Sequence, residues 1–151
     1  MAPAAKVLLV EDDPNDVELT LSALTGNHLA NEVVVTRDGE EALDYLYRRG
    51  AYESREESNP AVMLLDLKLP KVDGLEVLRR VKADADLRKI PVVILTSSRE
   101  EQDLVRSYDS GTNAYVVKPV DFHDFIEAVK ELGLFWTVVN HPPPGSTGRT
   151  G

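Results

Sequence analysis

The sequence contains no cysteine in its 151 residues, which excludes disulfides, thiolate nucleophiles and zinc–thiolate sites. It also has no apolar run that approaches the roughly 20 residues needed to span a bilayer. The first five residues lack the charged and apolar regions of a secretory signal. We therefore expect a cytoplasmic protein without membrane contact.

Basic residues are scarce relative to acidic ones: 17 Lys and Arg face 26 Asp and Glu, which gives a formal net charge of -9. A nucleic-acid-binding protein needs basic side chains against phosphates, and this surface would repel them. Direct binding of DNA or RNA is therefore not expected. The 42% hydrophobic content excludes a disordered chain, and the length suits one packed domain.

Five short aliphatic or β-branched runs alternate with longer helical patterns. Three of the runs are apolar without alternation, which is typical of strands that are covered on both faces in a parallel sheet. The runs are residues 6–10, 32–36, 61–65, 92–95 and 114–117.

Helix-capping residues stand before each of the five helical patterns, at Asp13, Asp38, Asp73, Ser98 and Asp121. A strand followed by a helix, five times over, predicts a doubly wound α/β domain. We assign residues 1–140 to this domain and residues 141–151, rich in Pro and Gly, to an irregular tail. The polar stretch 50–59 is expected to be a surface loop or a frayed helix end.

Polar residues follow four of the predicted strands. Glu11 and Asp12 follow the first, Asp66 follows the third, Thr96 follows the fourth and Lys118 follows the fifth. Function gathers at the carboxyl ends of strands in an open parallel sheet. If these strands are neighbours, the five side chains converge on one small site.

Crowded carboxylates repel each other unless a cation neutralises them. Mg²⁺ suits such a group, because it is held by a few carboxylates and keeps several waters. Lys118 would supply a point charge for a phosphate oxygen, and Thr96 a hydroxyl donor. Each element also has an ordinary interpretation: the acidic run as a solvated helix cap, Thr96 as a helix start and Lys118-Pro119 as a turn.

Four segments together resemble the receiver domain of response regulators in two-component signalling; they are residues 8–13, residues 64–70 with Asp73-Gly74, residues 93–97 and residues 114–119. The resemblance implies a flavodoxin-like sheet of five parallel strands in the order 2-1-3-4-5, with five helices. It implies that Asp66 accepts a phosphoryl group from the phosphohistidine of a sensor histidine kinase. It makes Asp12 a direct Mg²⁺ ligand, Glu11 a ligand through water and the backbone carbonyl of Lys68 a further ligand. It also implies a cis Lys118-Pro119 bond.

The resemblance further implies a switch, in which Thr96 moves toward the aspartyl phosphate and Tyr115 fills the vacated space. This coupling would reshape the surface of the fourth helix, fifth strand and fifth helix. The alternative for Tyr115 is a fixed, half-buried aromatic side chain. Lys68 and Ser98 lie two residues after Asp66 and Thr96 and are candidates for tuning the lifetime of the phosphoryl group.

A closer resemblance is to the small single-domain regulators that partner phytochrome-type kinases, carried by residues 38–46, 88–91, 107–108 and 118–122. Beyond residue 132 the chain stays apolar. We expect Phe135, Trp136, Val138 and Val139 to form a homodimer interface. The alternative is that Trp136 folds back over its own domain.

Three other functions compete with a phosphorylated regulator. A pseudo-receiver that binds a protein without phosphorylation usually lacks one of the acid pair, the acceptor or the lysine, and all are present here. An aspartate-nucleophile phosphatase requires a second Asp at the position that Lys68 occupies. A nucleotide or flavin site requires a Gly-rich loop after the first strand, and this sequence has none there. We therefore expect a non-enzymatic phosphoacceptor that serves an unidentified downstream protein or acts as a phosphate sink.

Overall fold

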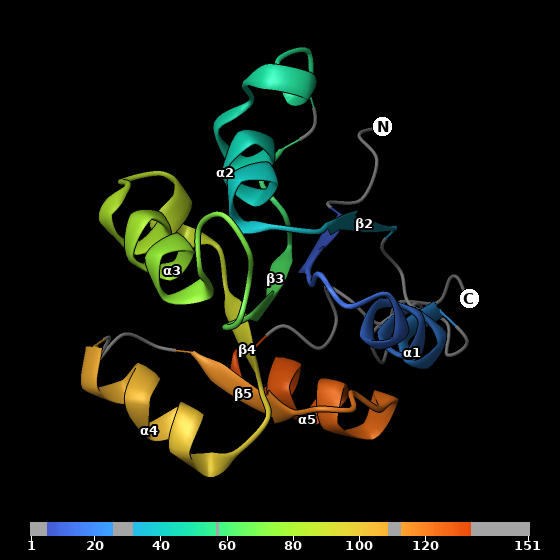
Figure 1. Ribbon diagram of the computed structural model, residues 1–151. Coiled ribbons are helices and arrows are strands. Elements are labelled where there is room, and N and C mark those ends of the chain that lie inside the picture. The colour runs from blue at the N-terminus through green and yellow to red at the C-terminus, as the bar shows by residue number, and fades with distance from the viewer. Residues whose placement is uncertain (1–5, 26–31, 57, 109–112, 134–151) are drawn as a thin grey trace, which may run out of the picture.

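The computed structural model describes residues 6–25, 32–56, 58–108 and 113–133. In this part of the chain five parallel strands form one sheet in the order β2-β1-β3-β4-β5, flanked by five α-helices (Figure 1). The predicted fold class and strand order are thereby confirmed. The elements are β1 (Val7–Val10), α1 (Pro14–Thr25), β2 (Val33–Thr36), α2 (Gly39–Tyr47), β3 (Val62–Asp66), α3 (Gly74–Ala83), β4 (Val92–Thr96), α4 (Arg99–Tyr108), β5 (Ala114–Val117) and α5 (Phe122–Glu131), with short 3₁₀ helices η1 (Gly50–Tyr52) and η2 (Leu87–Lys89).

The central strands are buried on both faces, as their uninterrupted apolar runs predict. Successive strand residues point to opposite faces, so each strand supplies two cores. Leu8, Met63 and Ile94 pack with α2, α3 and α4, whereas Leu9 and Leu64 pack with α1 and α5. This helix–sheet–helix layering fixes the strands rigidly and leaves their carboxyl ends free to carry polar groups.

Asp side chains cap the helices where the sequence predicts them. Asp38 Oδ1 accepts a hydrogen bond from Glu41 N at 2.7 Å, and Asp121 Oδ1 accepts one from Asp124 N at 2.7 Å. Asp13 Oδ1 does the same for Asn15 N at 2.8 Å. Such caps satisfy backbone N–H groups that have no partner inside the helix. They also fix where each helix begins relative to the strand before it.

Strands β3 and β4 each extend one residue further than their apolar runs. Asp66 pairs with Leu95, and Thr96 pairs with Val117. Both residues therefore belong to the sheet, since the backbone ladder does not require an apolar side chain. The carboxylate of Asp66 and the hydroxyl of Thr96 are held by strand backbone rather than by loops.

The polar stretch after α2 is more ordered than predicted. Tyr52 lies in η1, and its hydroxyl donates to Glu41 Oε2 at 2.6 Å. Its ring meets that of Tyr45 edge-on at 5.1 Å, and Arg55 stacks over Tyr45 at 4.1 Å. The tyrosine and the arginine attach this segment to α2, which the polar composition of the stretch does not reveal.

Two predictions fall on residues outside the described ranges. These are the dimer candidates Phe135, Trp136, Val138 and Val139, and the tail 141–151. Among the helices that the structure describes, none combines the length and apolarity that crossing a membrane requires.

Candidate functional site

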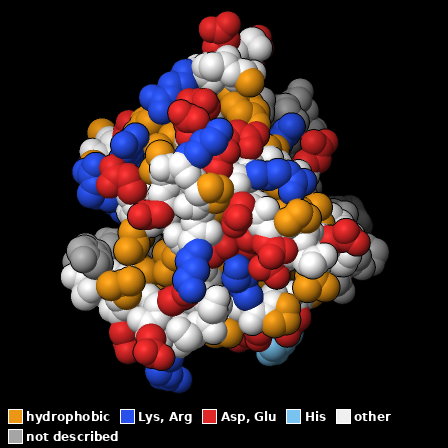
Figure 2. Space-filling view, viewed as in Figure 1, with side chains coloured by type: hydrophobic (Ala, Val, Ile, Leu, Met, Phe, Trp, Pro, Cys, Tyr) orange, Lys and Arg blue, Asp and Glu red, His pale blue; other side chains and the backbone are white. Residues whose placement is uncertain are grey.

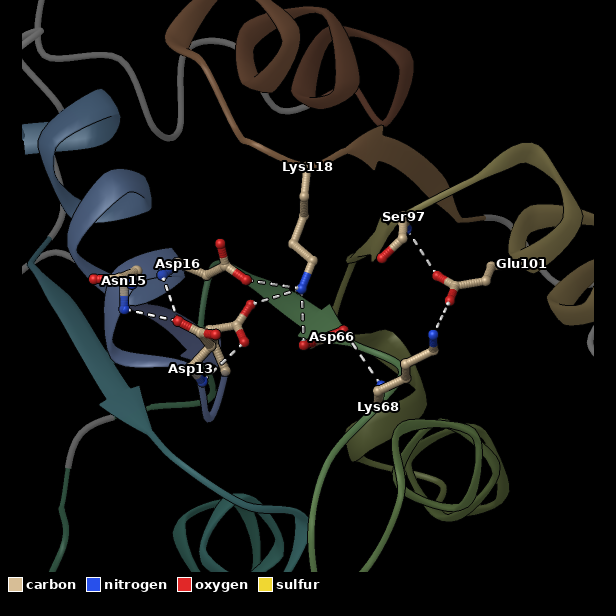
Figure 3. Close-up of polar contacts among 9 residues, drawn as sticks. Asp13, Asn15, Asp16, Asp66, Lys68, Ser97, Glu101 and Lys118 are labelled. Carbon is tan, nitrogen blue, oxygen red and sulfur yellow. Dashed lines mark hydrogen bonds and ion pairs between the residues drawn. The ribbon is translucent and has the colours of Figure 1, made fainter.

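The predicted site residues lie together at the carboxyl edge of the sheet. Glu11 and Asp12 directly follow β1, Asp66 ends β3, Thr96 ends β4 and Lys118 follows β5. Acidic and basic side chains lie next to each other across the centre of this face (Figure 2). The close-up shows the Lys118 side chain pointing toward Asp66 and Asp16 (Figure 3).

Three carboxylates form a compact group of oxygen donors. Ligand atoms of Glu11, Asp12 and Asp66 all lie within 4.8 Å of one another. Glu11 is fully buried and Asp66 is 4% exposed, whereas Asp12 faces solvent. The arrangement gives a hard cation two fixed donors on the protein side and one on the open side, and oxygen-only donors suit Mg²⁺.

Lys118 forms ion pairs with three carboxylates in this structure. Its Nζ lies 3.1 Å from Asp66 Oδ2, 3.3 Å from Glu11 Oε1 and 3.2 Å from Asp16 Oδ2. The lysine side chain is only 16% exposed, so these ion pairs are shielded from solvent. A cis peptide bond joins Lys118 to Pro119, as the family resemblance implies.

Asp16 is a site residue that was not predicted from the sequence. It lies in the first turn of α1, three residues after the cap Asp13, and its carboxylate contacts Lys118. An acidic residue in the first turn is common for helix-dipole reasons alone. The sequence could have indicated Asp16, because the predicted helix begins directly after the acid pair and its first turn must therefore border the site.

The crowding shifts two pKa values. Burial, the hydrogen bond with Asp66 and the charge of Asp66 raise the pKa of Glu11 to about 7. Burial alone would lower the pKa of the Lys118 ammonium, but Asp66, Glu11 and Asp16 outweigh burial and raise the pKa. Lys118 therefore stays charged throughout the physiological range, while Glu11 holds a proton below neutral pH when no cation is bound.

The other side of Asp66 is built from the β3–α3 and β4–α4 loops. Lys68 N donates to Asp66 Oδ1 at 3.3 Å, and the Lys68 side chain forms an ion pair with Glu101 at 3.3 Å. The hydroxyl of Thr96 is buried and has no hydrogen-bond partner in the described ranges. Ser98 Oγ accepts from Glu101 N at 3.3 Å and so caps α4. This side offers one unused hydroxyl close to Asp66.

A glycine allows the chain to turn tightly after Asp66. A Cβ on Gly74 would lie 2.3 Å from the carbonyl oxygen of Asp66, and Gly74 N donates to Leu67 O at 2.9 Å. Any side chain here would push the start of α3 away from β3. The Asp73-Gly74 pair therefore holds the loop that contains Lys68 against the site.

Tyr115 lies on β5 beside Ile94, two residues before Thr96 on the neighbouring strand. Its side chain is half-buried, and the guanidinium of Arg106 on α4 stacks over its ring at 4.5 Å. Arg106 was not predicted from the sequence to contact Tyr115. An exposed arginine in the last turn of a helix carries no signal of its own, and only the packing of α4 on β5 shows the contact.

An open groove of about 500 Å³ leads from the carboxylates along the β3–α3 loop to α4. Its lining includes Asp12, Lys68, Pro70, Glu101 and Leu104. The groove reaches the carboxylate group at Asp12, its exposed member. The arrangement can thus bind a divalent cation and present a carboxylate to an incoming phosphoryl group.

The sequence-family model of the "Response regulator receiver domain" matches residues 7–130 of this chain. The chain belongs to this family. Among curated relatives, "Response regulator Rcp1" of Synechocystis sp. is 39% identical over 134 residues, which covers 89% of this chain and 90% of Rcp1. The family assignment inferred from the four sequence segments is thereby confirmed.

Solved structures extend the comparison. The bacteriophytochrome response regulator AtBRR is 63% identical with a TM-score of 0.87, covering 93% of this chain and all of AtBRR. The phosphorylated cyanobacterial phytochrome response regulator RcpA is 42% identical with a TM-score of 0.70, and the match covers 88% of this chain and 94% of RcpA. A Mn²⁺-bound form of Rcp1 is 37% identical with a TM-score of 0.70, and the match covers 92% of this chain and 99% of Rcp1. The resemblance to phytochrome-associated regulators is confirmed at this level.

Proposed function

We propose that this chain accepts a phosphoryl group on Asp66 from the phosphohistidine of a sensor histidine kinase, with Mg²⁺ bound beside it. The observation that carries the proposal is the placement of Asp66: a buried carboxylate at a strand end, beside an acid pair and a lysine 3.1 Å away. The phytochrome-related neighbours favour a kinase of the phytochrome type.

In the transfer, a carboxylate oxygen of Asp66 forms the new bond to phosphorus while the phosphorus–nitrogen bond of the donor breaks and the histidine leaves. The three outer phosphoryl oxygens carry negative charge throughout, so catalysis is mainly positioning and charge stabilisation. Lys118 offers its ammonium to one oxygen, and Thr96 offers its free hydroxyl to another. Both groups already lie at the strand ends beside Asp66.

The cation site is proposed to use the carboxylates of Glu11, Asp12 and Asp66 with the backbone carbonyl of Lys68. When bound, Mg²⁺ offsets the charge of the carboxylates and of the incoming phosphoryl group. The Mn²⁺-bound form of the relative Rcp1 supports a divalent site in this family. The carboxylate cluster in the present structure fits the group.

The proposed output is a shift between two packings around Thr96 and Tyr115. Thr96 would turn its hydroxyl toward the phosphoryl oxygens, and Tyr115 would move into the space beside it. Because Arg106 on α4 stacks on Tyr115, this movement changes the surface formed by α4, β5 and α5. A downstream protein would read that surface as a population shift.

The decisive experiment is phosphorylation of the purified chain, followed by intact-mass spectrometry, using phosphoramidate and then a panel of phytochrome-type kinases. We expect a gain of one phosphoryl group that requires Mg²⁺ and is absent in Asp66→Asn. Asp73→Asn is the matched control, because asparagine also caps a helix and Asp73 lies in the same loop. Equal phosphorylation of Asp66→Asn and the parent would remove the proposal.

A second arm tests the cation site. Asp12 faces solvent, so Asp12→Asn should leave the fold intact while reducing Mg²⁺ affinity, and high Mg²⁺ should restore part of the uptake. Asp13→Asn, which keeps the cap of α1, should behave as the parent. Loss of uptake in both variants would point to the helix start rather than to a metal ligand.

A further inference from the structure

The carboxylate of Glu101 contacts both the β3–α3 loop and the β4–α4 loop, which lie on the opposite side of Asp66 from the acid pair. Glu101 Oε1 accepts from Ser97 N at 2.8 Å, and Glu101 Oε2 lies 3.3 Å from Lys68 Nζ. The carboxylate is largely shielded, with 16% of the side chain exposed. Figure 3 shows the resulting chain of contacts from Asp66 through Lys68 and Glu101 to Ser97.

The N–H of Ser97 lies at the same edge of the sheet as Asp66. Asp66 pairs with Leu95 across β3 and β4, so Ser97 is two residues beyond that pair at the same edge. It directly follows Thr96, whose buried hydroxyl lacks a partner. Backbone N–H groups fixed at such an edge are suitable donors to an anionic oxygen. In this structure the Ser97 N–H is already used by Glu101.

We propose that Glu101 is a positioning residue that stabilises the unphosphorylated state by competing with the phosphoryl oxygens for the Ser97 N–H. Lys68 assists by holding the other carboxylate oxygen. The inference rests on the proposed function of Asp66 as phosphoacceptor. It adds a regulatory contact, made by the third residue of α4, that opposes the switch.

The competition follows from charge. A phosphoryl group on Asp66 adds negative charge near Glu101 and offers new acceptors to Ser97 N–H and to the Lys68 ammonium. Both partners of Glu101 are then drawn toward Asp66, and the carboxylate is repelled. Releasing Glu101 frees the β4–α4 loop, so part of the binding energy of the phosphoryl group is spent on breaking this contact. Removing the competitor should therefore strengthen binding of a phosphoryl mimic.

The alternative is that Glu101 only caps α4. Its N–H bonds to Ser98 Oγ, and a glutamate three residues after a serine is a common capping box. A pure cap affects the stability of α4 in both states equally. It leaves the affinity for a phosphoryl mimic unchanged, and this difference separates the two interpretations.

The test uses the full chain with Mg²⁺ and beryllofluoride, a phosphoryl mimic, and measures the dissociation constant by NMR titration. Glu101→Ala should bind about fivefold more tightly than the parent, the change expected for net loss of one hydrogen bond. Glu101→Gln keeps a neutral acceptor and should show a smaller gain. Lys68→Met should change affinity less than about twofold, because an exposed ion pair contributes little.

Glu100→Ala is the matched control. Glu100 also lies in the first turn of α4 and is exposed, and its side chain makes no hydrogen bond or ion pair in the part of the chain that the structure describes. Its loss should leave the affinity as in the parent. The Ser97 amide gives an independent signal: its proton resonance in the free protein should shift in Glu101→Ala, which removes the hydrogen-bond acceptor, but not in Glu100→Ala.

The outcomes separate the two proposals. If the parent chain binds no beryllofluoride with Mg²⁺, the proposed function fails. If the parent binds but Glu101→Ala and Glu101→Gln bind equally well or more weakly, the competition is wrong and Glu101 is a cap. If Glu101→Ala does not fold, the Glu101→Gln affinity and its Ser97 resonance decide the matter, and parent-like values for both overturn the inference.

Discussion

Asp66 separates two regions that hold their polar groups in different ways. On one side, the carboxylates of Glu11 and Asp16, together with Asp66 itself, lie within 3.3 Å of a single ammonium group. On the other, a buried hydroxyl has no partner in the described ranges, and a backbone amide is held by one carboxylate. We call Glu11, Asp12, Asp16 and Lys118 the acid side, and Lys68, Thr96, Ser97 and Glu101 the switch side.

The difference indicates a division of work. The acid side has more charge than it can balance without a cation, since Lys118 supplies one positive charge to three carboxylates. The switch side has an unused donor and a contact that can be exchanged. A cation therefore balances the charge of the acid side without a change of fold. A phosphoryl group instead offers new hydrogen-bond acceptors to the switch side, and forming those bonds requires its side chains to move.

The largest effect should come from removing the ammonium of the acid side. In Lys118→Met, the buried carboxylates of Glu11 and Asp66 face each other without a counter-charge. Breaking a buried ion pair in this way costs about 3 kcal/mol of unfolding free energy. Urea unfolding at neutral pH without Mg²⁺ should show this loss. Saturating Mg²⁺ should recover part of it, because the cation replaces the missing charge.

The control for this variant is Lys130→Met, which removes an exposed ion pair with Glu127 at 3.5 Å. Its unfolding free energy should fall by less than about 0.5 kcal/mol, and Mg²⁺ should have the same effect as on the parent. An equal loss in the two variants, or no recovery of Lys118→Met by Mg²⁺, would contradict the account of the acid side.

A smaller effect is expected from pH. The pKa of Glu11 is raised to about 7 in the cation-free fold, above its ordinary value of 4.5. Below pH 7 the buried carboxyl is protonated, and Mg²⁺ must displace that proton to bind. Calorimetric titration should show Mg²⁺ affinity falling by up to about tenfold per pH unit below 7, the limit for one coupled proton.

The same shift predicts the stability of the cation-free chain. The folded state binds a proton at Glu11 more tightly than the unfolded state, so this group lowers stability as pH rises from about 4.5 to about 7. Glu11→Gln should remove that slope, and Asp13→Asn should keep it. A slope that survives in Glu11→Gln would assign the proton to another group.

The sequence was sufficient for the fold and for the placement of the predicted side chains at one edge. Uninterrupted apolar runs identified the buried strands, and strand ends then located Asp66, Thr96 and Lys118 without any contact being known. This works because the carboxyl ends of neighbouring parallel strands must meet at one edge. The position of a residue along its strand was enough.

The residues that were missed depend on helix orientation instead. Asp16, Glu101 and Arg106 all lie on helices and reach the site or the switch residues through their side chains. Whether a helical side chain reaches a strand end depends on how the helix is rotated and tilted on the sheet, which local periodicity does not specify. The ordered segment around Tyr52 was missed because its stability comes from contacts with α2.

The smallest expected effect tests the switch side with opposite signs for stability and binding. Thr96 is fully buried and its hydroxyl lacks a partner in the described ranges. Valine has the same shape without the unsatisfied group, so Thr96→Val should raise the unfolding free energy of the unphosphorylated chain by about 1 kcal/mol. The same variant should bind beryllofluoride more weakly, because it has lost a donor to the phosphoryl oxygens.

Thr36→Val is the matched control: Thr36 is equally buried but donates to Leu9 O at 3.5 Å, so its replacement should lower stability and leave beryllofluoride binding as in the parent. A loss of stability in Thr96→Val would mean that the hydroxyl already has a partner in solution, and the contrast between the two sides of Asp66 would then rest on Ser97 and Glu101 alone.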